Sequence, residues 1–316
     1  MITIDRYTPE CRREWDDFTA ASRNATFIFD RGYMEYHADR FSDFSLMARD
    51  AKGHLMAILP ACREGSVLYS HRGLTYGSWL LPSRRCDALD MLDIFATMRE
   101  FLRANGITSL IYKTIPYIYT QQPAEEDRYA LFVAGARLSC SLVSSVVDLT
   151  DPIPFDQGSR QRARKAQQLP GVSMGRSEAF GPFWDVLTEL LSSRYGSKPV
   201  HSLSEIELLR SRFPKNIELF TATESGGEIL AGVVIYRCGQ VAHSQYTAAS
   251  PRGKELSVLP GLYRSIMDHY AAQGLRWFDF GTSNEDGGRR VNEGLLRQKC
   301  SYGGRAVTYD TYTLDI

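Results

Sequence analysis

The chain has 316 residues, of which 43% are hydrophobic and 23% are charged. This length suits two domains with ordinary cores, and the composition is that of a globular protein. Lys and Arg together number 37, as do Asp and Glu, so the net charge is zero. The net charge therefore gives no electrostatic basis for tight nonspecific binding to nucleic acid, but it does not exclude a local basic patch.

The first half begins with an aromatic-rich segment, residues 22–44, in which the spacing at residues 31–41 predicts a helix. Three strands are predicted next, at residues 45–49, 54–63 and 66–71, with glycine turns between them.

An amphipathic pattern predicts a helix at residues 87–104, and Gly106 suits its C-terminal cap. A strand is predicted at residues 109–114. The Pro- and Gln-rich residues 116–127 indicate a loop or a short helix.

The chain then repeats this order of elements. Residues 43–116 and residues 216–283 both read as strand, turn, strand, turn, strand, helix, glycine, strand. The two turn glycines are 12 positions apart in each copy, at Gly53 and Gly65 and again at Gly227 and Gly239. A unit repeated at this scale predicts two domains of one fold with a cleft between them.

The best domain boundary is Asp151-Pro152-Ile153-Pro154, because two prolines interrupt any element there. We therefore expect one domain at residues 1–150 and another at residues 151–316. Helices are predicted at residues 183–195, 204–213 and 259–272, and a last strand within residues 303–316. A capping box is predicted at Ser204-Glu205-Ile206-Glu207. The expected fold class is α/β (α+β), with a mixed, mostly antiparallel sheet flanked by helices in each domain.

One strongly basic run follows the boundary and contains Arg160, Arg162, Arg164 and Lys165. In one interpretation it contacts an RNA acceptor stem or another polyanion. In the other it is a solvated helix surface, which is the usual place for such residues.

Targeting and metal signals are weak in this sequence. The N-terminus has no secretory pattern, and no apolar run approaches the roughly 20 residues needed to span a bilayer. The six cysteines are scattered, with no close pair and no histidine at metal-ligand spacing. We expect free thiols, no metal site and a cytoplasmic protein without a membrane span.

The second repeat ends in a strand carrying Phe278-Asp279-Phe280-Gly281, and this order of sheet, helix and strand resembles the GNAT N-acyltransferase fold. The tandem arrangement and the closing passage at residues 292–304, with Asn292, Gly294 and Lys299, resemble the FemAB-like branch. The resemblance extends from Phe27 to the C-terminus. It implies transfer of an amino acid from aminoacyl-tRNA to an amine of a peptidoglycan precursor, or a related reaction in envelope-polysaccharide or secondary-metabolite pathways.

Two features depart from these families. GNAT enzymes hold the coenzyme A pyrophosphate with a compact [QR]-x-x-G-x-[GA] turn that opens a helix. The corresponding residues 250–261 lack that spacing, and their basic side chains, Arg252 and Lys254, are the candidate cofactor-binding residues. In addition, the long coiled-coil arm of many tRNA-using members has no counterpart in this sequence.

Amide formation requires a base for the amine, stabilisation of the oxyanion and close placement of the two reactants. Lys299 matches the lysine of the closing motif, which the resemblance assigns to charge neutralisation, and a solvated helix end is the alternative. Asp279 lies in an apolar strand, either as a structural acceptor of hydrogen bonds or as a base. Glu285 and Asp286 follow in a glycine-rich loop at the carboxyl end of that strand, where sites often form.

Tyr246 corresponds to a tyrosine of the family's cleft, where a phenol would orient the amine or the donor carbonyl. His243 lies near it, and His71 has the equivalent place in the first repeat. Imidazole is the natural proton acceptor near neutral pH, although a lone strand histidine is more often a core residue. The candidate catalytic residues are therefore Lys299, Tyr246, His243, Asp279 and His71.

The passage from His71 to Gly77, with Lys113 and Tyr117 beyond it, predicts a basic, glycine-rich surface in the first domain. Arg72 and Lys113 would hold a phosphate of a nucleotide acceptor, and the alternative is an ordinary hairpin. The candidate substrate-binding residues are Arg72, Tyr76, Lys113, Tyr117, Glu285 and Asn292.

Three functions stay open at this point. The first is an N-acyltransferase that moves an (amino)acyl group from aminoacyl-tRNA or another carrier to a primary amine of a cell-envelope or secondary-metabolite precursor. The second is an acyl-CoA-dependent N-acetyltransferase acting on an amino sugar or small amine, and the third is a non-catalytic binding module. In the first two, the acyl donor is a co-substrate and no cofactor is tightly bound. We expect an amine acceptor, tRNA as a candidate partner, and no DNA partner.

Overall fold

The computed structural model describes residues 2–316, apart from the side chain of Tyr195. Its residues form two compact units. Unit 1 comprises residues 1–143, 286–289 and 308–316, and unit 2 comprises residues 144–285 and 290–307. The predicted division at residue 150 treated each domain as one continuous segment, whereas here the last nine residues belong to unit 1. The structure of each unit is described separately below.

Unit 1 begins with short elements around an antiparallel three-stranded sheet, β1-β2-β3. Its larger sheet has the order β4-β5-β6-β15-β7, in which β5 and β6 are parallel. The helices are α1 (Arg12–Ala21), α2 (Arg31–Met34), α3 (Ala88–Ala104) and α4 (Glu126–Val133). The strands are β1 (Thr3–Arg6), β2 (Leu46–Arg49), β3 (Leu55–Leu59), β4 (Cys62–Glu64), β5 (Val67–Tyr69), β6 (Ser109–Lys113), and the parts of β7 (Arg137–Asp148) and β15 (Arg305–Asp315) that lie in this unit.

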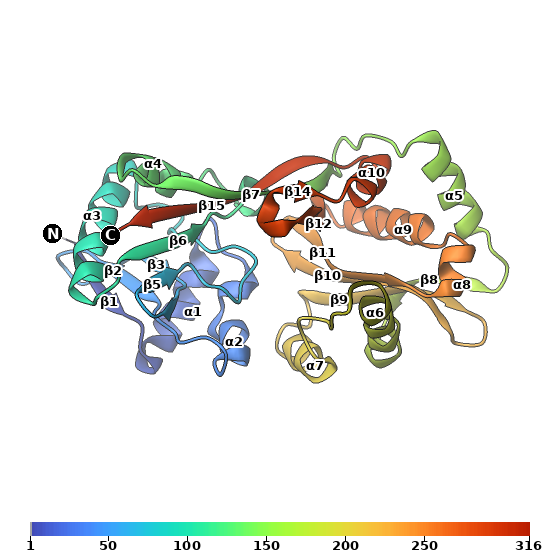
Figure 1. Ribbon diagram of the computed structural model, residues 1–316, viewed down its shortest axis with the longest axis horizontal. Helices are drawn as coiled ribbons and strands as arrows, with labels where there is room; N and C mark the ends of the chain where they lie inside the picture. The colour runs from blue at the N-terminus through green and yellow to red at the C-terminus, as the bar shows by residue number, and fades with distance from the viewer. Residues whose placement is uncertain (1) are drawn as a thin grey trace. The chain divides into compact units, whose positions relative to one another are not determined.

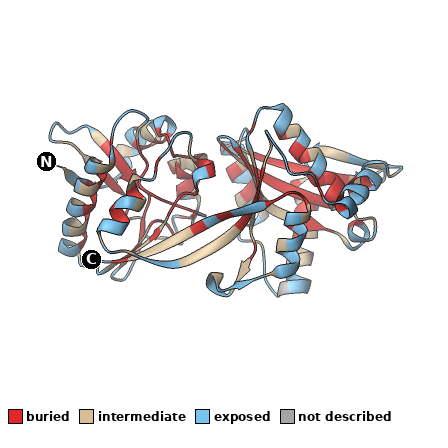
Figure 2. Ribbon diagram, turned by 90° about the horizontal axis from the view of Figure 1, so that it is seen from above, coloured by how far each residue is buried: buried red, intermediate tan, exposed pale blue. Residues whose placement is uncertain are grey.

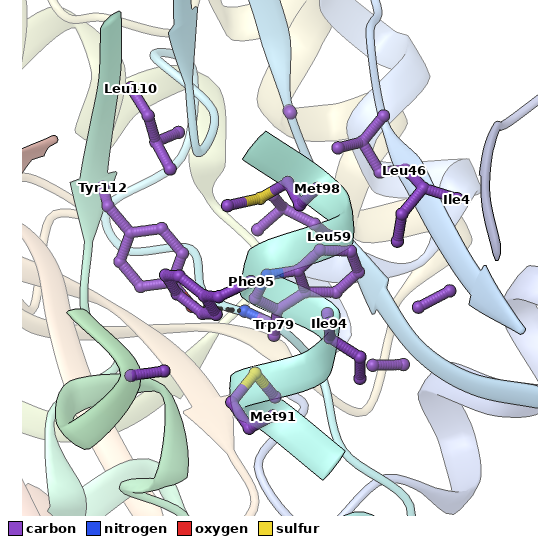
Figure 3. Close-up of a cluster of buried hydrophobic side chains, with 14 of the residues drawn as sticks. Ile4, Leu46, Leu59, Trp79, Met91, Ile94, Phe95, Met98, Leu110 and Tyr112 are labelled. Carbon is purple, nitrogen blue, oxygen red and sulfur yellow. Dashed lines mark hydrogen bonds between the residues drawn. The ribbon is translucent and has the colours of Figure 1, made fainter. Parts of the chain in front are cut away.

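The core of unit 1 lies between α3 and the strands (Figure 3). α3 begins with a capping box in which Asp87 accepts hydrogen bonds from the backbone of Leu89 and Asp90, and it presents one apolar face to the sheet. Inside the core, the backbone N–H of Trp79 donates to the Tyr112 hydroxyl at 2.7 Å. The buried core side chains labelled in Figure 3 are Ile4, Leu46, Leu59, Trp79, Met91, Ile94, Phe95, Met98, Leu110 and Tyr112.

Unit 2 contains a mixed sheet of order β7-β12-β11-β10-β9-β8, in which β11 and β12 are parallel and the other neighbouring strands that the structure describes are antiparallel. Helices α5 and α9 cover one face, and α6 and α7 cover the other (Figure 1). The helices are α5 (Gln157–Gln167), α6 (Phe180–Tyr195), α7 (Leu203–Arg212), α8 (Pro251–Glu255), α9 (Leu259–Ala272) and α10 (Glu293–Ser301). The further strands are β8 (Val172–Ser177), β9 (Ile217–Glu224), β10 (Ile229–Cys238), β11 (Val241–Ala249), β12 (Trp277–Thr282), β13 (Asn284–Glu285) and β14 (Arg290–Val291).

The core of unit 2 forms where α9 packs on the sheet, because its apolar side chains, including Leu262, Ile266 and Tyr270, recur at helical spacing. Buried residues concentrate in the strands and on the inner faces of the helices (Figure 2). The predicted fold class, a mixed sheet flanked by helices, is confirmed.

Most predicted elements are present, and three differ. The strand predicted at residues 54–63 is broken into β3 and β4, which lie in different sheets, because Pro60 lacks the N–H that a continuous ladder needs. The helix predicted at residues 31–41 ends at Met34 and continues as a 3₁₀ turn, Glu35–His37. The capping box of α7 uses Ser202 and Glu205, not Ser204 and Glu207.

Candidate active site

Three strands of unit 2 bring polar side chains together around Asp279. This residue lies on β12, and its side chain is completely buried. Its Oδ1 accepts the backbone N–H of Gly281 at 2.8 Å and the hydroxyl of Ser144 on β7. Its Oδ2 lies 3.1 Å from Nδ1 of His243 on β11. Groups from three strands thus converge on this one carboxylate.

The register of the sheet places these residues. His243 and Asp279 are directly opposite each other in the parallel β11–β12 pair, and they form its last paired position. Beyond that point β11 has a bulge near Ser244, and β12 shifts register after Asp279, where Gly281 adopts φ +77°. Bulges of this kind redirect side chains and end strand pairing, and they are frequent next to active sites.

The contact with Asp279 determines the tautomer of His243. When Nδ1–H donates to the carboxylate, Nε2 is the nitrogen that carries the lone pair. This arrangement of an acid orienting an imidazole is the one that general-base catalysis uses. The predicted candidates His243 and Asp279 are therefore brought together by the fold.

Lys299 reaches the same region from α10. Its ammonium donates to the carbonyl oxygens of Gly281 and Thr282, both at 2.8 Å. Burial lowers the pKa of Lys299 to about 8, and the nearby negative charge of Asp279 opposes that shift. Lys299 is 7% exposed, so the alternative of a solvated helix end does not describe it.

The other candidates of unit 2 have different surroundings. Tyr246 also lies on β11, but its hydroxyl is 2.5 Å from Nδ1 of His201, and its ring packs edge-on against Trp184. Arg252 is on the short helix α8 and pairs with Glu255 at 3.4 Å, and Lys254 follows on the same helix.

The hairpin β13–β14 holds two further candidates. Glu285 accepts hydrogen bonds from Arg290 and Asn292, and Asn292 caps α10 by accepting the N–H of Leu295. Asp286 belongs to unit 1. These contacts show that Glu285 and Asn292 stabilise the local structure. Their role in substrate binding stays a prediction.

In unit 1, His71 is buried and adopts φ +68°. Lys113 donates to the carbonyl oxygen of Leu74 at 2.9 Å, and burial lowers its pKa. Arg72 forms an ion pair with Glu64. The phosphate-binding surface predicted from Arg72 and Lys113 therefore consists of side chains that already have protein partners.

The two remaining candidates in unit 1 differ in exposure. The Tyr76 side chain is buried, with its hydroxyl 3.3 Å from that of Thr26. The Tyr117 side chain is 54% exposed. The predicted roles of Tyr76 and Tyr117 in substrate binding stay predictions.

The basic run of the second half lies on α5. Ser159, Ala163 and Ala166 form the buried face of this helix. Arg160, Arg162, Arg164 and Lys165 are exposed. This is the arrangement of a solvated helix surface, and contact with a polyanion stays a prediction.

The sequence interpretation missed Ser144 and His201. Ser144 lies in β7, a strand that was not predicted, although residues 142–147 include three of the valine side chains that are typical of strands. His201 follows the exposed Val200 in a loop and carries no local signal. Across residues 2–316, no group of three or more His, Cys, Asp or Glu side chains could hold a metal ion. All six cysteines are free thiols, and no helix within residues 2–316 is long and apolar enough to cross a bilayer.

Comparison with known proteins identifies the fold. The family model described as an acetyltransferase (GNAT) domain matches residues 155–286. A search of curated protein sequences finds no match. Among solved structures, FemX is 12% identical with a TM-score of 0.69, and the alignment covers 97% of this chain and 96% of that chain.

Two other solved structures are similar over nearly the whole chain. A tandem GNAT protein from the clavulanic acid biosynthesis pathway is 13% identical, with a TM-score of 0.56 and coverage of 100% of this chain and 98% of that chain. The C-terminal domain of a putative lysylphosphatidylglycerol synthetase from Agrobacterium fabrum is 15% identical, with a TM-score of 0.60 and coverage of 96% and 91%. Identities this low establish the fold alone. The chain therefore has the GNAT acyltransferase fold, its residues 155–286 match the model of the acetyltransferase (GNAT) domain, and its predicted resemblance to the FemAB-like branch is confirmed at the level of the fold.

Proposed function

We propose that this protein is an N-acyltransferase that moves an (amino)acyl group from an activated carrier, such as aminoacyl-tRNA, to a primary amine of a cell-envelope or secondary-metabolite precursor. The observation that carries the proposal is the His243–Asp279 pair at the last paired position of β11 and β12. The fold similarity to FemX supports the class of reaction.

In this proposal His243 Nε2 removes a proton from the acceptor amine as its nitrogen attacks the carbonyl carbon of the donor. Asp279 holds the imidazole in the required tautomer and stabilises the imidazolium that forms. The tetrahedral intermediate then collapses, the bond from carbon to the carrier breaks, and the imidazolium returns a proton to the leaving group. The carrier leaves as an alcohol from an ester or as a thiol from a thioester.

Lys299 has the charge that the intermediate needs. An ammonium has three N–H donors, and the carbonyl oxygens of Gly281 and Thr282 take two of them. We assign the third to the oxyanion. A positive charge in a site that is nearly closed to water stabilises developing negative charge more strongly than an exposed one does.

A second candidate is an acetyl-CoA-dependent N-acetyltransferase, which the family model of residues 155–286 favours. Two local features favour a carrier other than coenzyme A. The first turn of α9 contains Pro260, which has no N–H to offer a pyrophosphate. Arg252 is paired with Glu255. The proposed donor is therefore aminoacyl-tRNA or another carrier-bound acyl group.

Thermal-shift titration distinguishes the donors. The purified protein is titrated separately with acetyl-CoA, with aminoacyl-tRNA and with uncharged tRNA. We expect aminoacyl-tRNA to raise the melting temperature more than uncharged tRNA does. Stabilisation by acetyl-CoA alone would select the second candidate, and a response to none of the three would support the non-catalytic binding module.

A variant pair tests the role of His243 once the donor is known. His243→Gln should lower turnover by about 10²-fold or more, since general-base catalysis typically contributes 10²–10⁴-fold. The matched control is His269→Gln, because His269 is a histidine of α9 that bonds Gln273 away from Asp279. Equal turnover of the two variants would remove His243 from the mechanism.

A further inference from the structure

Unit 1 contains a cavity of about 300 Å³ that the proposed acyl transfer does not use. It is lined by the N-terminal segment, α2, the following 3₁₀ turn, and the region of His71. All of these belong to unit 1. The side chains that decide its chemistry are Arg31, His37, Phe41, Asp43 and His71.

Arg31 is completely buried and only partly satisfied. Its Nη1 donates to Asp43 Oδ2 at 2.5 Å, and the guanidinium carbon lies 3.4 Å from the centre of the Tyr7 ring and 3.9 Å from that of Trp15. Its Nε and Nη2 are buried without a hydrogen-bond partner among residues 2–316. These two atoms form the other edge of the guanidinium, a planar fork whose spacing matches the two oxygens of a carboxylate.

Two imidazoles also line the cavity. The His37 ring is buried and hydrogen-bonds to the backbone at Met34 and Gly73. His71 Nδ1 accepts the backbone N–H of Gly73 at 3.2 Å, so its Nε2 carries the hydrogen. The two rings are 5.2 Å apart. Burial lowers the pKa of both imidazoles, that of His71 to about 3, which favours the neutral form.

Two buried nitrogens of Arg31 thus lack hydrogen-bond partners among residues 2–316, beside this cavity. Leaving a buried polar atom unpaired costs about 1–3 kcal/mol, and native proteins contain few such atoms. Their gathering at one cavity indicates a site for a ligand that accepts hydrogen bonds.

The charge around the cavity selects the ligand. Its lining carries two arginines, Arg6 and Arg31, and two acids, Glu35 and Asp43, so the formal charges cancel. A singly charged anion suits such a lining better than a doubly charged phosphate does. Met34 and Phe41 supply apolar surface for the rest of the ligand.

We propose that this cavity binds a small monocarboxylate with an apolar or aromatic body. The carboxylate pairs with the Nε–Nη2 edge of Arg31 and accepts the Nε2–H of His71. The apolar body packs against Met34 and Phe41. This site belongs to unit 1 alone and does not depend on the proposed acyl transfer.

Isothermal titration with three probes of the full chain tests the proposal. Benzoate should bind, whereas benzamide and inorganic phosphate should bind at least about tenfold more weakly. Benzamide is neutral and forms no charge-assisted hydrogen bond as an acceptor. Phosphate has a second negative charge that the lining does not balance, and it has no apolar body to pack against Met34 and Phe41. Binding of none of the three, equal binding of benzoate and benzamide, or tighter binding of phosphate would overturn the proposal.

His71→Asn locates the site with little change to the backbone. Asparagine tolerates φ near +68°, and its Oδ1 can accept the Gly73 N–H as Nδ1 does, but it lacks the Nε2 donor. We expect about tenfold weaker benzoate binding than in the wild type. The control is His54→Asn at the exposed histidine that bonds Asp50, and equal loss in both variants would contradict the assignment.

A measurement on the wild-type protein covers the case in which His71→Asn does not fold. The six histidine side chains give separate imidazole nitrogen signals in NMR. Benzoate should shift those of His37 and His71. Shifts confined to His201, His243 and His269 would place benzoate elsewhere and overturn the proposal.

Discussion

Lys299 illustrates how position changes the chemistry of a single residue. In unfolded chains its ammonium is fully hydrated, whereas here it donates to Gly281 and Thr282 in a site nearly closed to water. Burial disfavours the charged form, and the pKa falls to about 8. His71 shows the same effect more strongly, with a pKa lowered to about 3. For both residues the sequence supplies the functional group and the fold sets its protonation.

The pKa of Lys299 predicts a pH-dependent stability. Between pH 8 and 10.5, the ordinary pKa of a lysine side chain, the unfolded state holds a proton on this lysine that the folded state has lost. The free energy of unfolding of the wild type should therefore rise with pH in that window, relative to Lys299→Met, by up to about 1.4 kcal/mol per pH unit. Below pH 8 this lysine is protonated in both the folded and the unfolded state. The free energies of unfolding of the wild type and of Lys299→Met should therefore change in parallel there. Urea denaturation from pH 7 to 10 measures the difference, and a constant difference would contradict the lowered pKa.

At the scale of elements, local signals predicted helices better than strand breaks. The amphipathic pattern at residues 87–104 and at residues 259–272 corresponds to α3 and α9 almost to the residue. The ends of α7 were less certain from the sequence, because Ser202 and Ser204 both stand three residues before a glutamate. Only the backbone decides which serine caps the helix.

The cap of α7 can be tested by paired substitutions. Ser202→Ala removes the hydroxyl that accepts the N–H of Glu205, and it should destabilise the protein by about 1 kcal/mol. Ser204→Ala, two residues on in the first turn, should change stability by less than about 0.5 kcal/mol. Both free energies come from urea denaturation. A larger loss of stability for Ser204→Ala than for Ser202→Ala would instead indicate that Ser204 caps the helix, as predicted from the sequence.

Close packing on β10 gives a second prediction at this scale. A Cβ at Gly232 would lie 2.3 Å from the Phe183 ring of α6, so Gly232→Ala should destabilise by about 1–3 kcal/mol through overpacking. The control is Gly175→Ala on β8, where a Cβ meets nothing within 4 Å. Thermal denaturation should separate the two variants. Similar melting temperatures would mean that α6 packs less closely on β10.

At the scale of the whole molecule, the chain does not divide into two consecutive segments. β7 and β15 each have residues in both units, so the last residues, 308–316, complete unit 1. Sequence punctuation such as Pro152 and Pro154 marks where elements stop, but it cannot show which strand returns to which sheet. The predicted cleft between two domains stays a prediction.

Leu314 tests this return of the chain. It lies on β15 at the far end of the sequence, yet it is 1% exposed in the core of unit 1. Leu314→Ala should destabilise unit 1 by about 2–5 kcal/mol. Hydrogen exchange followed by mass spectrometry should then show faster exchange in α3 and β6, with β9 and β10 unchanged. Thr308→Ala, at an exposed position of β15, is the control, and equal acceleration in both units would show that they unfold together.

The sequence by itself determined the order of elements, the two repeats, the main helices and the resemblance to GNAT enzymes, because these depend on local periodicity and on residues close together in the chain. It also pointed to His243, Asp279 and Lys299 one by one. Only the tertiary structure brought these three residues together. The same sheet also places Ser144 against Asp279, although the two are 135 positions apart in the chain. The same long-range packing produced the cavity at Arg31, because burial and unpaired hydrogen bonds arise from contacts that no local pattern encodes.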